Sequence, residues 1–166
     1  MPPSQELVQF DAGIHASTVL SWVKTATELL HWTGHEDFPL TDTGAFNQWH
    51  HDPDIHAFML SVGDELIGYG ECWYDDSDKS VELARLLISP DRRRQGHGQQ
   101  LVHLLLEPAK QFQPEDIWMR VHPQNKQAEQ LYLRLGFERV SDEQEATFNA
   151  GERLPFHWLR YTALAD

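Results

Sequence analysis

The sequence predicts an α/β fold of the mixed α+β kind, in which helices flank a mixed β-sheet. Two strand-like segments, Ala57–Val62 and Leu66–Tyr74, flank a short glycine-containing connection that is typical of an antiparallel hairpin. The chain then continues as strand, helix, strand, helix and strand, an order that indicates helices packed on a sheet. Because 166 residues fit one ordinary domain, residues 1–166 are expected to form a single domain.

The first part of the chain is expected to hold one strand and two helices. Residues Leu7–Phe10 are suited to a short strand, and apolar residues at helical spacing predict a helix over Ala16–Leu30. A second helix is predicted from Thr43 to about His50, with its N-cap at Thr41 or Asp42.

The remaining elements follow from alternating apolar patterns and from residues that start or stop helices. Asn125 is a good N-cap and Gly136 a good helix stop, so they bound one of these helices. The expected strands are Val81–Ile88, Ile117–Val121, Phe137–Val140 and Pro155–Thr162, and the expected helices are Gly98–Lys110 and Lys126–Leu135.

Composition excludes some classes of partner. The chain has 26 acidic residues against 13 Lys and Arg, which gives a formal net charge of −13 and a field that repels polyanions. Nucleic acid is therefore not expected as a partner. The lone cysteine, Cys72, excludes an internal disulfide and suits the cytoplasm. Neither a signal-peptide pattern nor an apolar run of about 18 residues occurs, so a cytoplasmic protein without a membrane partner is expected.

One short stretch, RRRQGHGQQL at residues 92–101, predicts an anion site. It follows a strand that Ser89-Pro90 breaks, and it leads directly into a helix. The free amides and positive end of a helix N-terminus attract anions, and glycines allow a ligand to approach the backbone closely. Arginines add charge-assisted hydrogen bonds, so a phosphate or pyrophosphate is the natural ligand. The alternative is a solvated basic turn.

This stretch resembles the pyrophosphate loop of the GNAT superfamily of acetyl-CoA-dependent N-acetyltransferases. The family pattern Arg/Gln-x-x-Gly-x-Gly/Ala matches Arg93, Gly96 and Gly98. The downstream segment VHPQNKQAEQLYLRLGFE is similar to the family's C-terminal motif, with Asn125 opening a helix and Tyr132 near its end. The two motifs together are far more specific than either alone.

The resemblance implies a central mixed, mostly antiparallel sheet that is splayed between two adjacent parallel strands. The pantetheine arm of acetyl-CoA, the acetyl-donor cosubstrate, would enter the opening between Val81–Ile88 and Ile117–Val121, and no metal is expected. The residues that the resemblance implies in cofactor binding are Leu86, Leu87, Ile88, Arg93, Arg94, Gln95, Gly96, His97, Gly98, Gln99 and Asn125.

The same resemblance implies two catalytic residues. Tyr132 matches the family's usual general acid, and a phenol is protonated at neutral pH yet can donate to a departing thiolate; the alternative is an aromatic side chain packed in the core. Glu82, six residues before Ile88, has the spacing of the base in histone-type members; the alternative is an exposed charge at a strand start. A backbone amide, that of Ile88 or Leu87, would bind the oxyanion.

The expected function is transfer of the acetyl group of acetyl-CoA to the primary amine of a small molecule by direct attack. A monomer or a homodimer is expected. Arg120 stands where ribosomal-protein N-terminal acetyltransferases carry a glutamate, which weakens the case for peptide acetylation. A protein or peptide acetyltransferase and a non-catalytic acyl-CoA sensor remain alternatives. Trp22, Trp32 and Trp49 are candidates for the wall of the acceptor pocket.

Overall fold

The computed structural model describes residues 3–164, which contain one seven-stranded sheet in the order β1-β2-β3-β4-β5-β7-β6. The strands are β1 (Gln5–Gln9), β2 (Ile55–Val62), β3 (Glu65–Asp75), β4 (Ser80–Ile88), β5 (Asp116–Val121), β6 (Phe137–Arg139) and β7 (His157–Tyr161). The helices are α1 (Ala12–Ser21), α2 (Ala26–Thr33), α3 (Gly44–Trp49), α4 (His97–Gln111), α5 (Lys126–Arg134) and α6 (Asp142–Asn149). Within residues 3–164, no helix has the length and apolar character needed to cross a membrane.

The sheet is mixed and mostly antiparallel, as the sequence predicts. Strands β1 to β4 form an antiparallel meander, and β7 pairs antiparallel with both β5 and β6. The parallel pair is β4 with β5, and it pairs only Ser80–Glu82 with Asp116–Trp118. Beyond Glu82 the two strands separate, so the rest of β4 has an open edge toward β5. The expected opening between adjacent parallel strands is therefore present.

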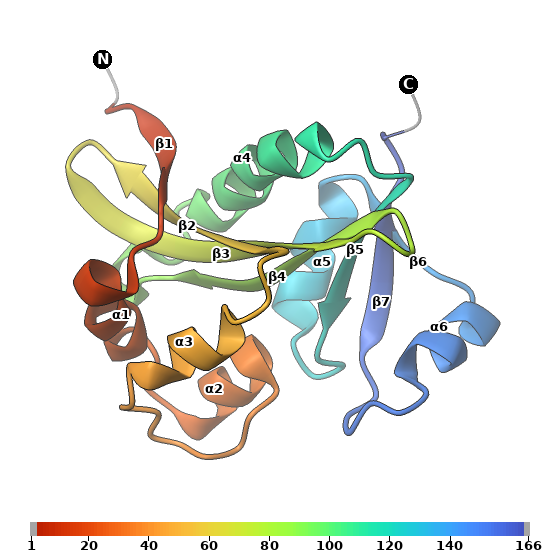
Figure 1. Cartoon of the computed structure of the whole chain (residues 1–166), viewed down its shortest axis with the longest axis horizontal. Coiled ribbons are helices and arrows are strands. Elements are labelled where there is room, and N and C mark those ends of the chain that lie inside the picture. Colours follow the sequence, from red (N-terminus) through yellow and green to blue (C-terminus); the bar gives the residue numbers. More distant parts are fainter. Residues whose placement is uncertain (1–2, 165–166) are drawn as a thin grey trace.

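Helices cover both faces of the sheet (Figure 1). Helix α4 lies on one face, where Leu101 and Leu105 pack with residues of β3, β4 and β5 in the larger core. Helices α1, α2 and α3 lie on the other face and form a second core around Phe46, Met59 and Tyr69. The two cores bury apolar surface on both sides of β2 and β3.

The prediction of one helix over Ala16–Leu30 was wrong, because the chain forms two helices separated at residues 22–25. Thr25 caps α2 by accepting the amide hydrogen of Glu28 at 3.0 Å, and the Glu28 carboxylate accepts the Lys24 amide hydrogen at 3.2 Å. This reciprocal arrangement is close to a capping box, which starts a new helix. The segment Thr25-x-x-Glu28 carries that signal in the sequence.

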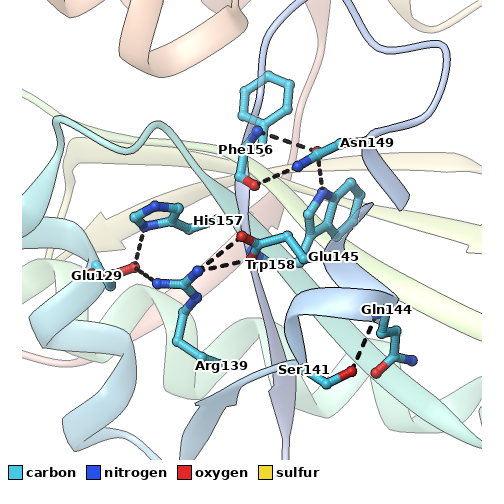
Figure 2. Close-up of polar contacts among 9 residues, drawn as sticks. All are labelled: Glu129, Arg139, Ser141, Gln144, Glu145, Asn149, Phe156, His157 and Trp158. Carbon is cyan, nitrogen blue, oxygen red and sulfur yellow. Dashed lines mark hydrogen bonds and ion pairs between the residues drawn. The ribbon is translucent and has the colours of Figure 1, made fainter. Parts of the chain in front are cut away.

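Helix α6 was not predicted, and it shapes the C-terminal side of the molecule. Ser141 caps it by accepting the Gln144 amide hydrogen at 3.1 Å (Figure 2). Asn149, at its end, accepts hydrogen bonds from the Phe156 amide at 3.2 Å and the Trp158 indole at 2.8 Å, and donates to the Phe156 carbonyl at 2.9 Å (Figure 2). Helix α6 therefore fixes the start of β7 and the position of Phe156.

Candidate active site

A β-bulge shapes the middle of β4. Tyr69 pairs with Leu87 and Glu71 pairs with Ala84, so two residues of β4, Arg85 and Leu86, lie opposite Gly70 alone. Arg85 has a positive φ of 51°, which only a strongly supported backbone adopts. The indole of Trp32 in α2 supports it by donating to the Arg85 carbonyl at 2.8 Å. A bulge bends its strand, which accounts for the separation of β4 from β5.

The opening leads into a cleft of about 540 Å³. It brings together most of the residues that the sequence implicates in cofactor binding, and the helix residue Tyr132. The members that line it are Leu86, Leu87, Ile88, Arg93, Arg94, Gly96, Gly98, Gln99, Asn125 and Tyr132. Gln95 and His97, beside the same turn, lie outside this lining; the side-chain Nε2 of Gln95 donates to the Asp91 carbonyl at 3.2 Å.

The edge of β4 offers a backbone donor to this cleft. Ser89 donates its amide hydrogen to the Ile67 carbonyl of β3 at 2.8 Å. Amide directions alternate along a strand, so the Ile88 amide points away from β3, toward the open side facing β5. Of the two predicted oxyanion donors, Ile88 therefore has the suitable direction.

The three adjacent arginines have different partners. Arg92 pairs with Glu65, away from the cleft. Arg93 holds the loop in place, because it donates to the Ile88 carbonyl at 2.9 Å and lies 3.3 Å from the carboxylate of Glu28. Arg94 has a positive φ of 62° and lines the cleft without a hydrogen bond or ion pair to any residue between 3 and 164. Its charge is therefore available to an anion.

The N-terminus of α4 has the features of an anion site. Gly96 is the N-cap in the left-handed region, with φ 86°, and no side chain caps the helix. The first-turn amides are therefore left for a ligand. His97 has its Nδ1 atom buried without a hydrogen-bond partner among the described residues. The donors of this helix end and the positive charge of Arg94 are the groups that a bound phosphate or pyrophosphate would need.

Beyond the cleft, a smaller cavity of about 120 Å³ lies on the α2 face of the sheet. The residues that line both spaces are His31, Trp32, Leu86, Asn125 and Tyr132. Burial raises the pKa of Tyr132 to about 12, so its phenol is protonated at neutral pH. Asn125 also caps α5, with its side chain accepting the Ala128 amide hydrogen at 3.4 Å. Tyr132 is thus a protonated phenol that lines both spaces.

Glu82 lines the smaller cavity, and its carboxylate is already paired. Arg120 donates to one oxygen at 2.7 Å and to the other at 2.8 Å. The guanidinium lies 4.4 Å from the ring of Trp158 and 3.4 Å from the carboxylate of Glu152. Burial lowers the pKa of Arg120, but the bonds and charge of Glu82 and Glu152 outweigh it and raise the pKa. The role of Glu82 as the base stays a prediction.

Two histidines of the smaller cavity were missed by the sequence reasoning. His31 in α2 and His122 after β5 have ring centroids 4.8 Å apart, and both line the smaller cavity. Burial and the charge of His122 lower the pKa of His31, so its imidazole is neutral at neutral pH and can accept a proton. The two residues are far apart in the sequence. Their separation left no local signal that joined them.

The three tryptophans named as candidates for the acceptor wall have different places. Trp32 lines both the cleft and the cavity. Trp49 lies behind the cavity wall, with its ring 4.4 Å from the guanidinium carbon of Arg85. Trp22 is buried in the second core and its carbonyl accepts a bond from Arg93 at 3.3 Å. Between residues 3 and 164, no group of three or more His, Cys, Asp or Glu side chains is placed to hold a metal ion.

Comparisons with known proteins concern the family and the fold. The sequence pattern of the Acetyltransferase (GNAT) family matches residues 22–137. An uncharacterised N-acetyltransferase of Mycobacterium tuberculosis is 29% identical over 93 residues, which are 56% of this chain and 59% of that protein. The chain spans less than two thirds of the length of the curated relatives it matches, 57% to 59% for the first of them.

Two solved structures share the fold along nearly the whole chain. One is a spermidine N-acetyltransferase from Vibrio cholerae in complex with CoA and spermine, with TM-score 0.71, 16% identity and coverage of 94% of this chain and 92% of that one. The other is an aminoglycoside acetyltransferase in complex with coenzyme A and kanamycin, with TM-score 0.73, 16% identity and coverage of 96% and 95%. At these identities the likeness concerns the fold.

Proposed function

The chain belongs to the acetyltransferase (GNAT) family, and on that basis we propose that it transfers the acetyl group of acetyl-CoA to the primary amine of a small molecule by direct attack. The observation that carries the proposal is the junction at Tyr132, where a cleft suited to the cofactor meets a second, smaller cavity. A cofactor and an acceptor that enter from these two spaces would meet beside a protonated phenol.

The cleft residues fit coenzyme A in kind and in place. The α4 N-terminus and Arg94 would hold the pyrophosphate, since both are free of partners among the described residues. The open edge of β4 would pair with the amide groups of the pantetheine arm, as a strand does. Arg93 would act indirectly, because its bonds to Ile88 and Glu28 hold the loop against the strand.

Each chemical need of acyl transfer has a candidate group at the junction. Bound acetyl-CoA supplies an activated thioester, whose carbonyl the Ile88 amide would polarise. Tyr132 would give its proton to the departing sulfur. Glu82, acting through water, is the predicted acceptor of the amine proton, and the neutral imidazole of His31 lies at the same junction.

The size of the cavity supports a small acceptor. A space of about 120 Å³ is far below the several hundred Å³ typical of sites for large ligands. Structures of the same fold contain spermine or kanamycin, both amines that are small next to a protein.

The test is thiol release from acetyl-CoA across a panel of amines, amino acids, polyamines, aminoglycosides and peptides. We expect amine-dependent release with some small primary amine, and an acetylated product of the corresponding mass. Tight binding of acetyl-CoA in calorimetry, together with no thiol release in the presence of any amine, would contradict the enzymatic function and favour an acyl-CoA sensor. Release with peptides alone would contradict the small-molecule acceptor.

A further inference from the structure

Arg85, on the bulge of β4, is held rigidly at the wall of the smaller cavity. Its guanidinium carbon lies 4.4 Å from the ring of Trp49 and 4.8 Å from the ring of Trp73. Its Nη1 atom donates to the Glu71 carboxylate at 2.9 Å. Aromatic rings on the guanidinium and a carboxylate at its tip leave the side chain little rotamer freedom.

Glu71 is the buried anchor of this arrangement. It is fully buried, and its carboxylate also accepts hydrogen bonds from the Trp73 indole at 2.7 Å and from the Tyr69 hydroxyl. His50 Nε2 lies 3.3 Å from the same carboxylate. A carboxylate with this many partners is fixed in place, so the orientation of Arg85 is set before any ligand arrives.

The other edge of the Arg85 guanidinium is unoccupied. Nε and Nη2 make no hydrogen bond to any residue between 3 and 164, and the side chain, 14% exposed, lines the cavity. Arg120, which also lines the cavity, differs, because its Nε and Nη2 atoms both donate to Glu82. The cavity is therefore lined by an oriented arginine that has two free donors on one edge, and an edge of this geometry binds a carboxylate through two parallel hydrogen bonds.

We propose that Arg85 binds a carboxylate of the acceptor, so that the acceptor is a compact amine that also carries a carboxylate, as in an amino acid. The inference rests on the proposed acetyltransferase function and names the substrate class of its acceptor cavity. A polyamine fits the cavity poorly, because a second ammonium group would meet Arg85 and Arg120, while Glu71 and Glu82 are already paired with these arginines.

The first experiment compares matched acceptors with the wild-type protein. Amino acids are tested against amines of the same chain length that lack the carboxylate, with kcat/KM measured for each by thiol release. We expect a preference of about tenfold or more for the carboxylate-bearing member, as a charge-assisted pair in a partly buried site provides. Equal use of both members, or a preference for the amine or for polyamines, would overturn the inference while leaving the acetyltransferase function intact. If no acceptor of any class supports thiol release, the result instead contradicts the proposed function.

The second experiment assigns the preference to Arg85. Arg85→Met keeps the aliphatic stem between the two indoles but removes the fork, and it should reduce the acid-to-amine ratio of kcat/KM to near one. Arg160→Met is the matched control, because Arg160 lies on β7 near Asp116 at 3.6 Å and lines neither the cleft nor the cavity; its ratio should be that of the wild type. An unchanged ratio in Arg85→Met would overturn the inference.

A third measurement needs no variant, and therefore does not depend on the folding of Arg85→Met. Propionate and butyrate carry the carboxylate without the amine, so they should inhibit the wild-type protein competitively against the acceptor and not against acetyl-CoA. The corresponding alcohols should not inhibit. Absence of competitive inhibition by either carboxylate at concentrations near the acceptor KM would overturn the inference.

Discussion

Arg120 holds Glu82 by two parallel hydrogen bonds, of 2.7 and 2.8 Å, across the β4–β5 pair at the point where the two strands begin to separate. This ion pair links Glu82, the last residue of β4 that pairs with β5, to β5 itself. Both side chains line the cavity in which the acceptor is proposed to bind. A carboxylate with both oxygens engaged can relay a proton only through a lone pair that Arg120 leaves free, which makes its catalytic role directly testable.

The first prediction is that Glu82→Gln lowers turnover and depresses the rise of rate with pH. Glutamine keeps the size of the side chain but cannot take up the amine proton. The pH dependence of kcat/KM in the variant and the wild type measures the effect. Glu152→Gln is the matched control, since Glu152 contacts the same guanidinium at 3.4 Å but does not line the cavity. If Glu82→Gln keeps the parent profile, Glu82 is an ion-pair partner alone, and His31 becomes the group to test.

The second prediction concerns the anion loop, in which Gly96→Val should weaken binding of acetyl-CoA. Gly96 has φ 86° at the N-cap of α4, so valine strains the backbone and places a branched side chain where the pyrophosphate is proposed to lie. Calorimetric titration measures the affinity.

Gly151→Val provides the control for strain in the Gly96 experiment. Gly151 has a similar φ of 85°, and in both glycines an added Cβ meets nothing within 4 Å. Both variants should lose stability on heating by similar amounts, whereas only Gly96→Val should lose affinity. Undiminished affinity in a folded Gly96→Val variant would remove this loop from the proposed cofactor site.

Local patterns predicted the parts of the site that lie close together in the sequence. Arg93, Gly96 and Gly98 occur within one turn and one helix start, so their common place in the cleft follows from chain connectivity. The pairing of Glu82 with Arg120 joins residues 38 positions apart, and it depends on the parallel register that sets Glu82 opposite Trp118. No local pattern specifies that register.

The division of the first long helix and the presence of α6 could have been predicted. Thr25-x-x-Glu28 and Ser141-x-x-Gln144 are both helix-start signals, and both are used as caps in the structure. Apolar periodicity continued through the first signal, and the weak periodicity of the acidic segment after Ser141 hid the second. The failure to predict α6 affected the account of the site, because Asn149 of that helix holds Phe156, which lines the smaller cavity.

The third prediction is that Glu71 makes the protein sensitive to acid. Burial raises the pKa of Glu71, but the hydrogen bonds from His50, Tyr69 and Trp73 and the charge of Arg85 outweigh it, so its pKa lies below the usual 4.5. The folded protein therefore binds fewer protons at this site than the unfolded chain does. Its contribution to the free energy of unfolding is complete above pH 4.5 and is lost as the pH falls through the lowered pKa of the folded state.

Urea unfolding of the wild type and of Glu71→Gln checks this third prediction. At neutral pH the variant should be less stable, since Arg85 loses its buried partner. The difference in the free energy of unfolding should narrow as the pH falls below 4.5. Glu65→Gln, at an exposed pair with Arg92, should change that free energy little at any pH. A wild-type advantage over Glu71→Gln that stays constant down to acid unfolding would contradict the prediction.

The last prediction is that Tyr132→Phe binds acetyl-CoA nearly as well as the parent and transfers the acetyl group more slowly. Phenylalanine keeps the ring, which packs 6.4 Å from that of Phe137, and removes only the hydroxyl. Loss of a general acid costs about 10²- to 10⁴-fold in rate when thiolate departure limits the reaction. Tyr161→Phe is the matched control, because Tyr161 also packs on Phe137, at 5.1 Å, but lines neither the cleft nor the cavity.

The measurement for Tyr132→Phe is single-turnover acetyl transfer, because steady-state turnover can be limited by product release and then conceals a slower chemical step. The pKa of about 12 keeps the phenol protonated across neutral pH, so the defect should be the same size throughout that range. A defect in Tyr161→Phe of equal size would assign the effect to packing. Parent-rate transfer by Tyr132→Phe across neutral pH would show that the hydroxyl is not the acid, and the thiolate must then take its proton from water or from the acceptor itself.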